Sequence, residues 1–154
     1  EEAILQIAML LEKNSICPDQ PSFYETVLPD HLLSINLDES EQQEIIAELG
    51  NLIWSEKMTA SMLWAIGKTT SRTALVPLLT WLRNHNRSLD EEATWQALIA
   101  LDNFLGLKVD GTLDCQVADM IRDHNVTSSL QQILETDNPR LKKLGQKLLN
   151  RIQR

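Results

Sequence analysis

The sequence has little of what marks several large classes of protein. Only two cysteines, Cys17 and Cys115, occur among 154 residues, and no histidine stands near either of them at metal-ligand spacing. This excludes a disulfide-stapled scaffold and a cysteine-based zinc site, and we expect ordinary thiols in a reducing, cytoplasmic setting. The chain contains only five glycines and five prolines, and 43% of its residues are hydrophobic. This composition is typical of a folded domain and argues against disorder.

A long apolar run is also missing. No stretch approaches the roughly 20 apolar residues that span a bilayer, so we expect no membrane span. The apolar stretch from Leu5 to Leu11 follows two glutamates, where a signal peptide would carry cations. Because the chain begins with Glu1 and not with methionine, we interpret it as a domain of a larger protein.

Basic residues are scarce until the last fifteen positions. Residues 1–56 contain twelve acids and one base, whereas residues 140–154 contain six bases and no acid. The net charge of −8 makes nucleic acid an unexpected main partner, because that binding depends on neutralising phosphates. We interpret the basic tail as a solvated helix face. Contact with phosphate or an acidic lipid surface, and a head-to-tail charge match between copies, are the alternatives.

Apolar residues at helical spacing dominate the middle of the sequence, from Ser61 to Leu105. Three helices are predicted here, separated by polar breaks. Gly67 ends the first helix and is expected to adopt the left-handed conformation of a C-cap. Pro77 must lie in a first turn, so the second helix is predicted to begin near Thr73. The residues expected to be buried are Met62, Leu63, Ala65 and Ile66, then Leu75, Val76, Leu78, Leu79 and Leu82, then Ala93, Ala97, Leu98, Ala100, Leu101 and Leu105.

Further helices are predicted on both sides of this region, and no strand is expected. A tight turn is predicted at Asp110-Gly111. Leu52 is expected on the buried side of its helix. The predicted helices, eight or nine in all, are 1–13, 22–28 with a short piece at 30–35, one capped by Asp38 or Ser40, the three of the middle region (the third beginning at Asp90), one from 112 or 114 to about 125, one capped by Thr127, and one from 140 to 152.

Part of this pattern recurs along the chain. Ala65-Ile66 and Ala97-Leu98 occupy equivalent helix positions at a period of about 32 residues, within the range of stacked repeats. The stretch 63–82, LWAIGKTTSRTALVPLLTWL, resembles a HEAT repeat of the short kind found in phycobilisome-lyase-type proteins. The shared features are a first helix that ends in glycine, a turn, and a second helix with an early Val-Pro. Residues 129–149, with their Asp-Asn-Pro-Arg turn, resemble a second unit.

The resemblance implies an all-α fold of stacked antiparallel helix pairs, forming a short right-handed α-α superhelix of the HEAT or armadillo kind. We expect a single domain, 1–154, with irregular helices over 1–38. The best repeat-like units are predicted over 39–105, and C-terminal units over 106–154. The resemblance carries an architecture and no site residues.

No catalytic, cofactor-binding or metal-ligating residue is predicted. Gly67-Lys68-Thr69 copies the end of a phosphate-binding loop, but the glycine that this loop needs five residues earlier is Met62. The histidines are scattered, and the acidic pairs are interpreted as solvated helix surface rather than as catalytic dyads. These residues are His31, His85 and His124, and the pairs Glu91-Glu92 and Asp119/Asp123.

Four tryptophans within 42 residues are the compositional oddity: Trp54, Trp64, Trp81 and Trp95. They are interpreted as packing between helices or, where they face outward on one side, as anchors for a partner. The sequence therefore predicts a non-catalytic module that binds a protein or peptide, or a scaffold, with a basic or aromatic segment as its expected partner. The alternative is an enzyme or lyase-like accessory protein of the bilin-lyase type.

Overall fold

The computed structural model describes residues 2–15, 28–53, 59–69, 72–85, 90–106, 108–109, 112–113 and 115–153. Within these ranges the chain forms nine α-helices, one turn of 3-10 helix and a two-stranded antiparallel sheet, so the all-α prediction is confirmed. The helices are α1 (Glu2–Ser15), α3 (Asp30–Leu33), α4 (Glu39–Leu52), α5 (Thr59–Ile66), α6 (Leu75–His85), α7 (Glu91–Leu105), α8 (Cys115–Asp123), α9 (Val126–Ile133) and α10 (Pro139–Ile152), with the 3-10 turn η1 at Arg72–Ala74.

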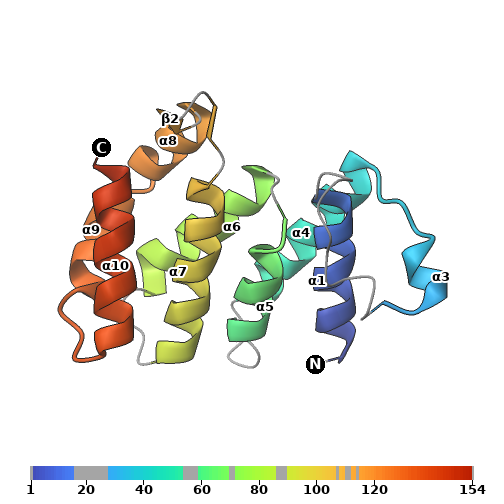
Figure 1. Ribbon diagram of the computed structural model, residues 1–154, viewed down its shortest axis with the longest axis horizontal. Helices are drawn as coiled ribbons and strands as arrows, with labels where there is room; N and C mark the ends of the chain where they lie inside the picture. Colours follow the sequence, from blue (N-terminus) through green and yellow to red (C-terminus); the bar gives the residue numbers. More distant parts are fainter. Residues whose placement is uncertain are drawn as a thin grey trace.

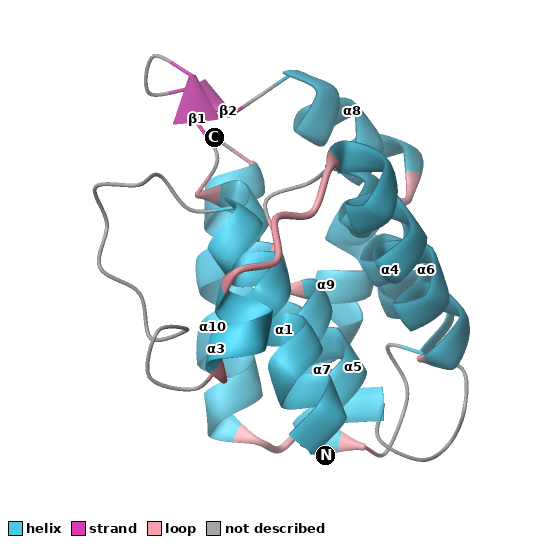
Figure 2. Cartoon of the chain, turned by 90° about the vertical axis from the view of Figure 1, so that its right-hand side faces the viewer, coloured by secondary structure: helices cyan, strands magenta, loops and turns pink. Residues whose placement is uncertain are grey.

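Successive helices alternate between two layers. Helices α1, α5, α7 and α10 lie side by side in the first layer, in that order, and α4, α6 and α9 form the second (Figure 1). The pairs α4/α5, α6/α7 and α9/α10 pack across the two layers. Figure 2 shows the layers from the end of the stack, with α4 and α6 on one side and α5 and α7 on the other. The molecule is therefore a row of helix pairs in which each helix contacts near neighbours.

The core lies between the two layers. Helix α7 supplies the widest apolar stripe, with eight buried residues from Ala93 to Leu105, because it has neighbours on three sides. The largest fully buried side chains in the described part of the chain are Trp81, Phe104, Met9, Leu11, Ile53, Leu63, Ile66, Leu75, Leu78, Leu79, Leu82 and Leu98. None of the described helices is long and apolar enough to cross a membrane.

Local hydrogen bonds explain where several helices begin. Asp38 caps α4 by accepting a hydrogen bond from the Glu41 N–H at 2.8 Å, and the Glu41 carboxylate accepts one from the Asp38 N–H, as a capping box requires. Asp90 accepts from the Ala93 N–H at 2.9 Å and starts α7. The start at Asp90 was predicted, and Asp38 is one of the two caps, Asp38 or Ser40, that were predicted for α4. Pro77 lies in the first turn of α6, as predicted, although the 3-10 turn η1 precedes it.

Other local predictions were wrong. Helix α9 begins at Val126, because Asn125 takes the left-handed conformation (φ 55°) and turns the chain two residues before the predicted cap. Lys108–Val109 and Thr112–Leu113 pair as short antiparallel strands, β1 and β2, around the predicted turn. The turn residues themselves, 110–111, lie outside the described residues, as do the predicted helix over 22–27 and Trp54.

Two apolar residues expected in the core lie on the surface. Val76 is 46% exposed on α6 and Leu52 is 45% exposed on α4. On α6 the buried stripe is made by Leu75, Leu78 and Leu82, and Val76 lies about 100° around the helix from Leu75. Helical periodicity locates the centre of a stripe well, but its edges depend on where the neighbouring helices sit.

Gly67 has a different role from the predicted one. Its backbone is not left-handed; it continues from α5, with its N–H donating to the Leu63 carbonyl at 3.1 Å. A Cβ atom at this position would lie 2.9 Å from the Cβ of Ala100 on α7. Gly67 is therefore required by the close approach of α5 and α7, which is also bridged by a hydrogen bond from the Asn103 side chain to the Gly67 carbonyl at 3.1 Å.

Candidate functional site

The structure separates the described tryptophans into two kinds. Trp81 is 1% exposed, lies within the core on α6 and is not a surface anchor. Trp64 on α5 and Trp95 on α7 are only partly buried and pack against the edge of the core. Trp81 therefore packs in the core. Of the described tryptophans, Trp64 and Trp95 remain candidates for partner binding, and Trp54 lies outside the described residues.

Each of these partly buried tryptophans has a cation over its ring. Lys68 Nζ lies 5.2 Å from the centre of the Trp64 ring, one turn further along the same segment. The Arg140 guanidinium carbon lies 3.9 Å from the centre of the Trp95 ring, and this contact joins α7 to the start of α10. A cation over an indole face is attracted by the ring quadrupole, and Trp is the strongest of the aromatic partners.

The two pairs lie on the same side of the molecule. On α5 the buried residues include Met62, Leu63 and Ile66, which leaves Trp64 and Lys68 on the opposite side of the helix. On α7 the buried stripe likewise leaves Trp95 and Ile99 outside it. Because α4, α6 and α9 lie on the inner side of this layer, the side of α5 and α7 that none of the described helices covers is its outer face.

The two tryptophans also lie at similar heights on their helices. Gly67 touches Ala100, which sets the level at which α5 and α7 meet. Trp64 precedes that level by three residues and Trp95 by five, so a rise of 1.5 Å per residue puts them about 3 Å apart along the helix direction. They are thus neighbours across one interhelical seam.

Helix α10 adds a row of cations to the same face. Arg140, Lys143, Lys147 and Arg151 are spaced three, four and four residues apart, which places them along one side of the helix. Asp102 on α7 pairs with Lys147 at 3.2 Å and with Arg151, and Arg151 also donates to the Leu105 carbonyl at 3.0 Å. These contacts orient the row toward α7. We call the whole surface the tryptophan face: Trp64, Lys68, Glu92, Trp95, Ile99, Asp102, Arg140, Lys143, Lys147 and Arg151.

The carboxylates on or beside this face have hydrogen-bond partners. Glu92 accepts from the Gln96 side-chain amide at 2.9 Å, and Glu91 accepts from Asn138 at 2.8 Å. Asp102 is bound by the two cations of α10. By contrast, Lys68 and Arg140 have no side-chain ion pair or hydrogen bond within the described residues, apart from their indole contacts. Two oriented cations are therefore available on a face whose carboxylates are already engaged.

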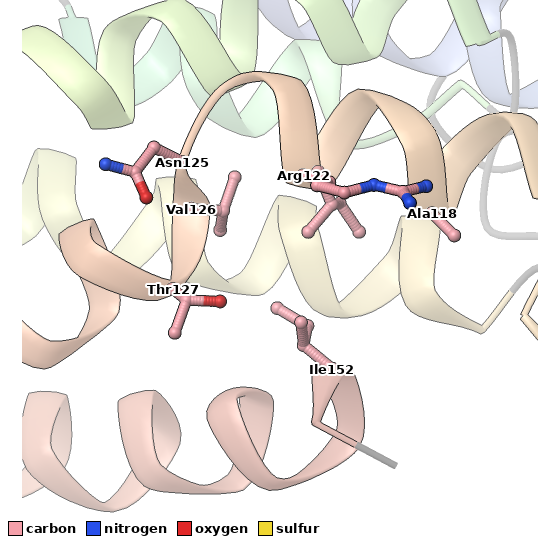
Figure 3. A pocket seen from close by; sticks show the side chains of 7 residues that line it. Ala118, Arg122, Asn125, Val126, Thr127 and Ile152 are labelled. Carbon is pink, nitrogen blue, oxygen red and sulfur yellow. The ribbon is translucent and has the colours of Figure 1, made fainter.

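A pocket lies elsewhere, where α8 and α9 meet the end of α10. Its volume is about 350 Å³, and Figure 3 shows Val126 and Thr127 on one side of it and Ile152 on the facing side. Arg122 at its rim forms an ion pair with Asp119. The lining contains no histidine, cysteine or carboxylate: it is Ala118, Ile121, Arg122, Asn125, Val126, Thr127 and Ile152.

The other residues singled out from the sequence do not come together. His124 is bonded through Nδ1 to the Met120 carbonyl at 2.9 Å, His31 is exposed, and Cys115 is an exposed free thiol. The N–H groups of Gly67, Lys68 and Thr69 are bonded to carbonyls of α5, so they form no phosphate cradle. In the described part of the chain no group of three acidic, histidine or cysteine side chains is placed to bind a metal ion.

Comparison with known proteins adds nothing to this picture. No protein-family model, curated protein or solved structure matches the chain. The resemblance to HEAT repeats therefore stays a prediction, and the candidate site depends on the geometry alone.

Sequence reasoning identified the tryptophans but missed the cations over them. The Trp64 and Lys68 pair was visible in principle, since residues four apart on a helix are neighbours. Arg140 is 45 residues from Trp95, so only the packing of α10 against α7 brings the two side chains together.

Quenching of tryptophan fluorescence by acrylamide should separate the two kinds of tryptophan. We expect Trp64→Phe and Trp95→Phe each to lower the average quenching constant, because each removes an accessible indole. Trp81→Phe should raise it, because it removes a protected one. A lower quenching constant for Trp81→Phe than for the unmodified chain would contradict the assignment of Trp81 to the core.

Proposed function

We propose that this chain is a non-catalytic helical-repeat module that binds a protein or peptide segment across the tryptophan face, as a recognition or scaffold unit. The observation that carries the proposal is the pair of partly buried tryptophans on neighbouring helices of one layer, each beneath a cation. Trp and Arg are the residue types most enriched among those that dominate binding energy at interfaces.

The architecture supports the same interpretation. A row of helix pairs offers an extended, continuous surface, and such stacks serve mainly as binding surfaces. We infer that the pairs α4/α5, α6/α7 and α9/α10 are HEAT-like units, and that they follow the right-handed superhelix of that fold. The alternation of the chain between two layers supports this inference.

The catalytic alternative has less support. An enzyme needs a pocket in which a nucleophile, an acid or a base converges with groups that stabilise charge. The described pocket beside Ile152 offers one arginine, already paired with Asp119, together with the Asn125 amide and the Thr127 hydroxyl. None of these groups is activated by a neighbouring base, so a binding role is the better proposal.

A random-peptide display library tests the proposed function without assuming the chemistry of the partner. Peptides that bind the unmodified chain are selected, and each is then measured against a Trp64→Ala/Trp95→Ala variant and against Val76→Ala, a change on the exposed side of α6. We expect the selected peptides to lose at least tenfold in affinity for the double variant and to bind Val76→Ala as before. Peptides that bind all three chains equally would contradict a role for this face, and so would a library that yields no binder.

A further inference from the structure

The cations over Trp64 and Trp95 are placed where they can also bind a negatively charged group of a partner. A guanidinium that lies flat on an indole keeps its N–H groups in the plane of the stack, where they can form two parallel hydrogen bonds to a carboxylate. Arg140 is exposed, and its guanidinium carbon lies 3.9 Å from the centre of the Trp95 ring, a distance at which the guanidinium can stack on the indole. The stacking restricts the rotamers of a long side chain before any partner arrives, so less conformational entropy is lost on binding.

The second cation repeats the arrangement on the other side of α7. Lys68 lies over Trp64 on α5, whereas Arg140 comes from α10. The charged groups themselves lie over indoles on adjacent helices, α5 and α7, which are one interhelical step of about 8–10 Å apart, so the two cations are roughly 10–15 Å apart across the face. An extended peptide covers that distance with about three or four residues, at roughly 3.3 Å per residue.

The surface between the two cations is apolar, and the carboxylates beside it already have hydrogen-bond or ion-pair partners. The two indoles and the half-buried Ile99 supply the apolar surface. Glu92 is bonded to Gln96, and Asp102 is bonded to Lys147 and Arg151. Lys143 adds a further exposed cation beyond Arg140. Charge complementarity therefore favours a partner with negative charge at both ends and apolar side chains between them.

We propose that the tryptophan face binds an acidic peptide segment, in which carboxylates about three or four residues apart meet Lys68 and Arg140 and apolar side chains between them pack on Ile99 and the two indoles. The proposal rests on the proposed function and names the chemistry of its partner. It differs from the sequence-based expectation of a basic or aromatic partner segment, because that expectation followed the acidic character of the N-terminal two-thirds of the chain. The exposed glutamates of α4, at 39, 41, 44 and 48, lie in the other layer.

A protein segment fits this face better than a phosphate surface does. Binding to nucleic acid or to an anionic bilayer depends on cations that neutralise many phosphates at once. Here Glu91 and Glu92 lie beside the cations and, within the described residues, are bonded only to neutral amides, so their negative charge would repel a continuous row of phosphates. A peptide can place its two carboxylates at Lys68 and Arg140 and avoid the acidic positions.

Fluorescence anisotropy with two matched peptides tests the proposal. The first is a labelled peptide of about twelve residues with glutamates roughly three or four residues apart and leucine and phenylalanine between them. The second has lysine in place of each glutamate. We expect the acidic peptide to bind at least tenfold more tightly than the basic one, and to lose affinity as salt rises from about 0.05 to about 0.5 M, because screening weakens exposed charge pairs.

Substitutions on the face and away from it supply the variants and their controls. Arg140→Gln and Lys68→Gln should each weaken the acidic peptide about fivefold, and the double variant about twentyfold. Lys142→Ala should leave binding unchanged, because Lys142 adjoins Lys143 in sequence but lies about 100° around α10 from it, on the flank away from α7. Arg83→Ala removes an exposed cation from the second layer and should also have no effect.

Several results would overturn the proposal and leave the proposed function standing. One is tighter binding of the basic peptide, and another is library-derived peptides that need Trp64 and Trp95 while the acidic peptide does not bind. Equal loss of the acidic peptide from Arg140→Gln and Lys142→Ala would show a diffuse charge effect. A further result would be displacement of the acidic peptide by phosphatidylserine vesicles or by a single-stranded oligonucleotide, with a dependence on Lys68 and Arg140. It would show that the site binds phosphate groups rather than a peptide.

Discussion

Trp81→Ala is expected to lower the free energy of unfolding by about 3–5 kcal/mol, the cost of truncating a large aromatic side chain in a packed core. Trp81 is 1% exposed, and its helix packs against α7, so the neighbouring helices have little freedom to fill the space. Domains of this size typically unfold with 5–15 kcal/mol, so the variant would lose a large share of its stability. Urea unfolding followed by far-ultraviolet circular dichroism measures the change.

Trp95→Ala is the matched control for this experiment. Trp95 is partly buried, and its removal costs a fraction of its apolar contacts together with the Arg140 stacking, which is worth about 0.5–1 kcal/mol at an exposed site. We therefore expect Trp95→Ala to destabilise the fold by much less than Trp81→Ala. Equal losses for the two variants, or a Trp81→Ala change within about 0.5 kcal/mol of zero, would contradict the division between core and face.

Gly67→Ala is expected to destabilise the fold by about 1–3 kcal/mol, although the new side chain is a single methyl group. The added Cβ would lie 2.9 Å from the Cβ and 3.1 Å from the Cα of Ala100, so α5 and α7 must move apart. Movement of the Ala100 backbone would also disturb the hydrogen bond from Asn103 to the Gly67 carbonyl. Thermal unfolding, with a shift of about 2–4 °C per kcal/mol for a domain of this length, measures the effect.

Gly145→Ala should have the opposite sign. Gly145 lies in the middle of α10, and a Cβ there would meet Leu134 at 3.4 Å, which is an ordinary van der Waals distance. Replacing a helix-interior glycine with alanine then stabilises by about 0.5–1 kcal/mol, because the unfolded chain has less backbone freedom to lose. If both glycine variants changed stability in the same direction, the close approach of α5 and α7 would not be the reason for Gly67.

The sequence predicts best those features that depend on near neighbours in the chain. Asp38 and Asp90 were identified as helix starts because a cap needs only its own side chain and an N–H three residues on. The first turn of α6 followed from the fixed geometry of Pro77. The buried stripe of α5 was also predicted, since a helical period of 3.6 is a local property.

Features that depend on packing between distant segments were not predictable. Gly67 looked like a helix cap, and only the approach of Ala100 shows why a side chain does not fit there. The exposure of Val76 follows from where α6 meets its neighbours, which its own sequence does not specify. Asn125 was missed as a turn because Thr127 is a good cap in isolation. For the candidate site, the tryptophans could be singled out, but the pairing of Trp95 with Arg140 required the fold.

The contacts that link α7 to α10 lie in the same surface that we propose for recognition. Arg140 stacks on Trp95, and Asp102 binds Lys147 and Arg151, so these side chains attach the last helix to the layer as well as shaping its outer face. A substitution that changes partner preference there also changes how firmly the last helix is attached. Binding specificity and the stability of the fold are therefore coupled at these positions. A lineage that acquires a new partner through this face would need compensating changes on the side of α10 that packs against α9, to restore the attachment of the last helix.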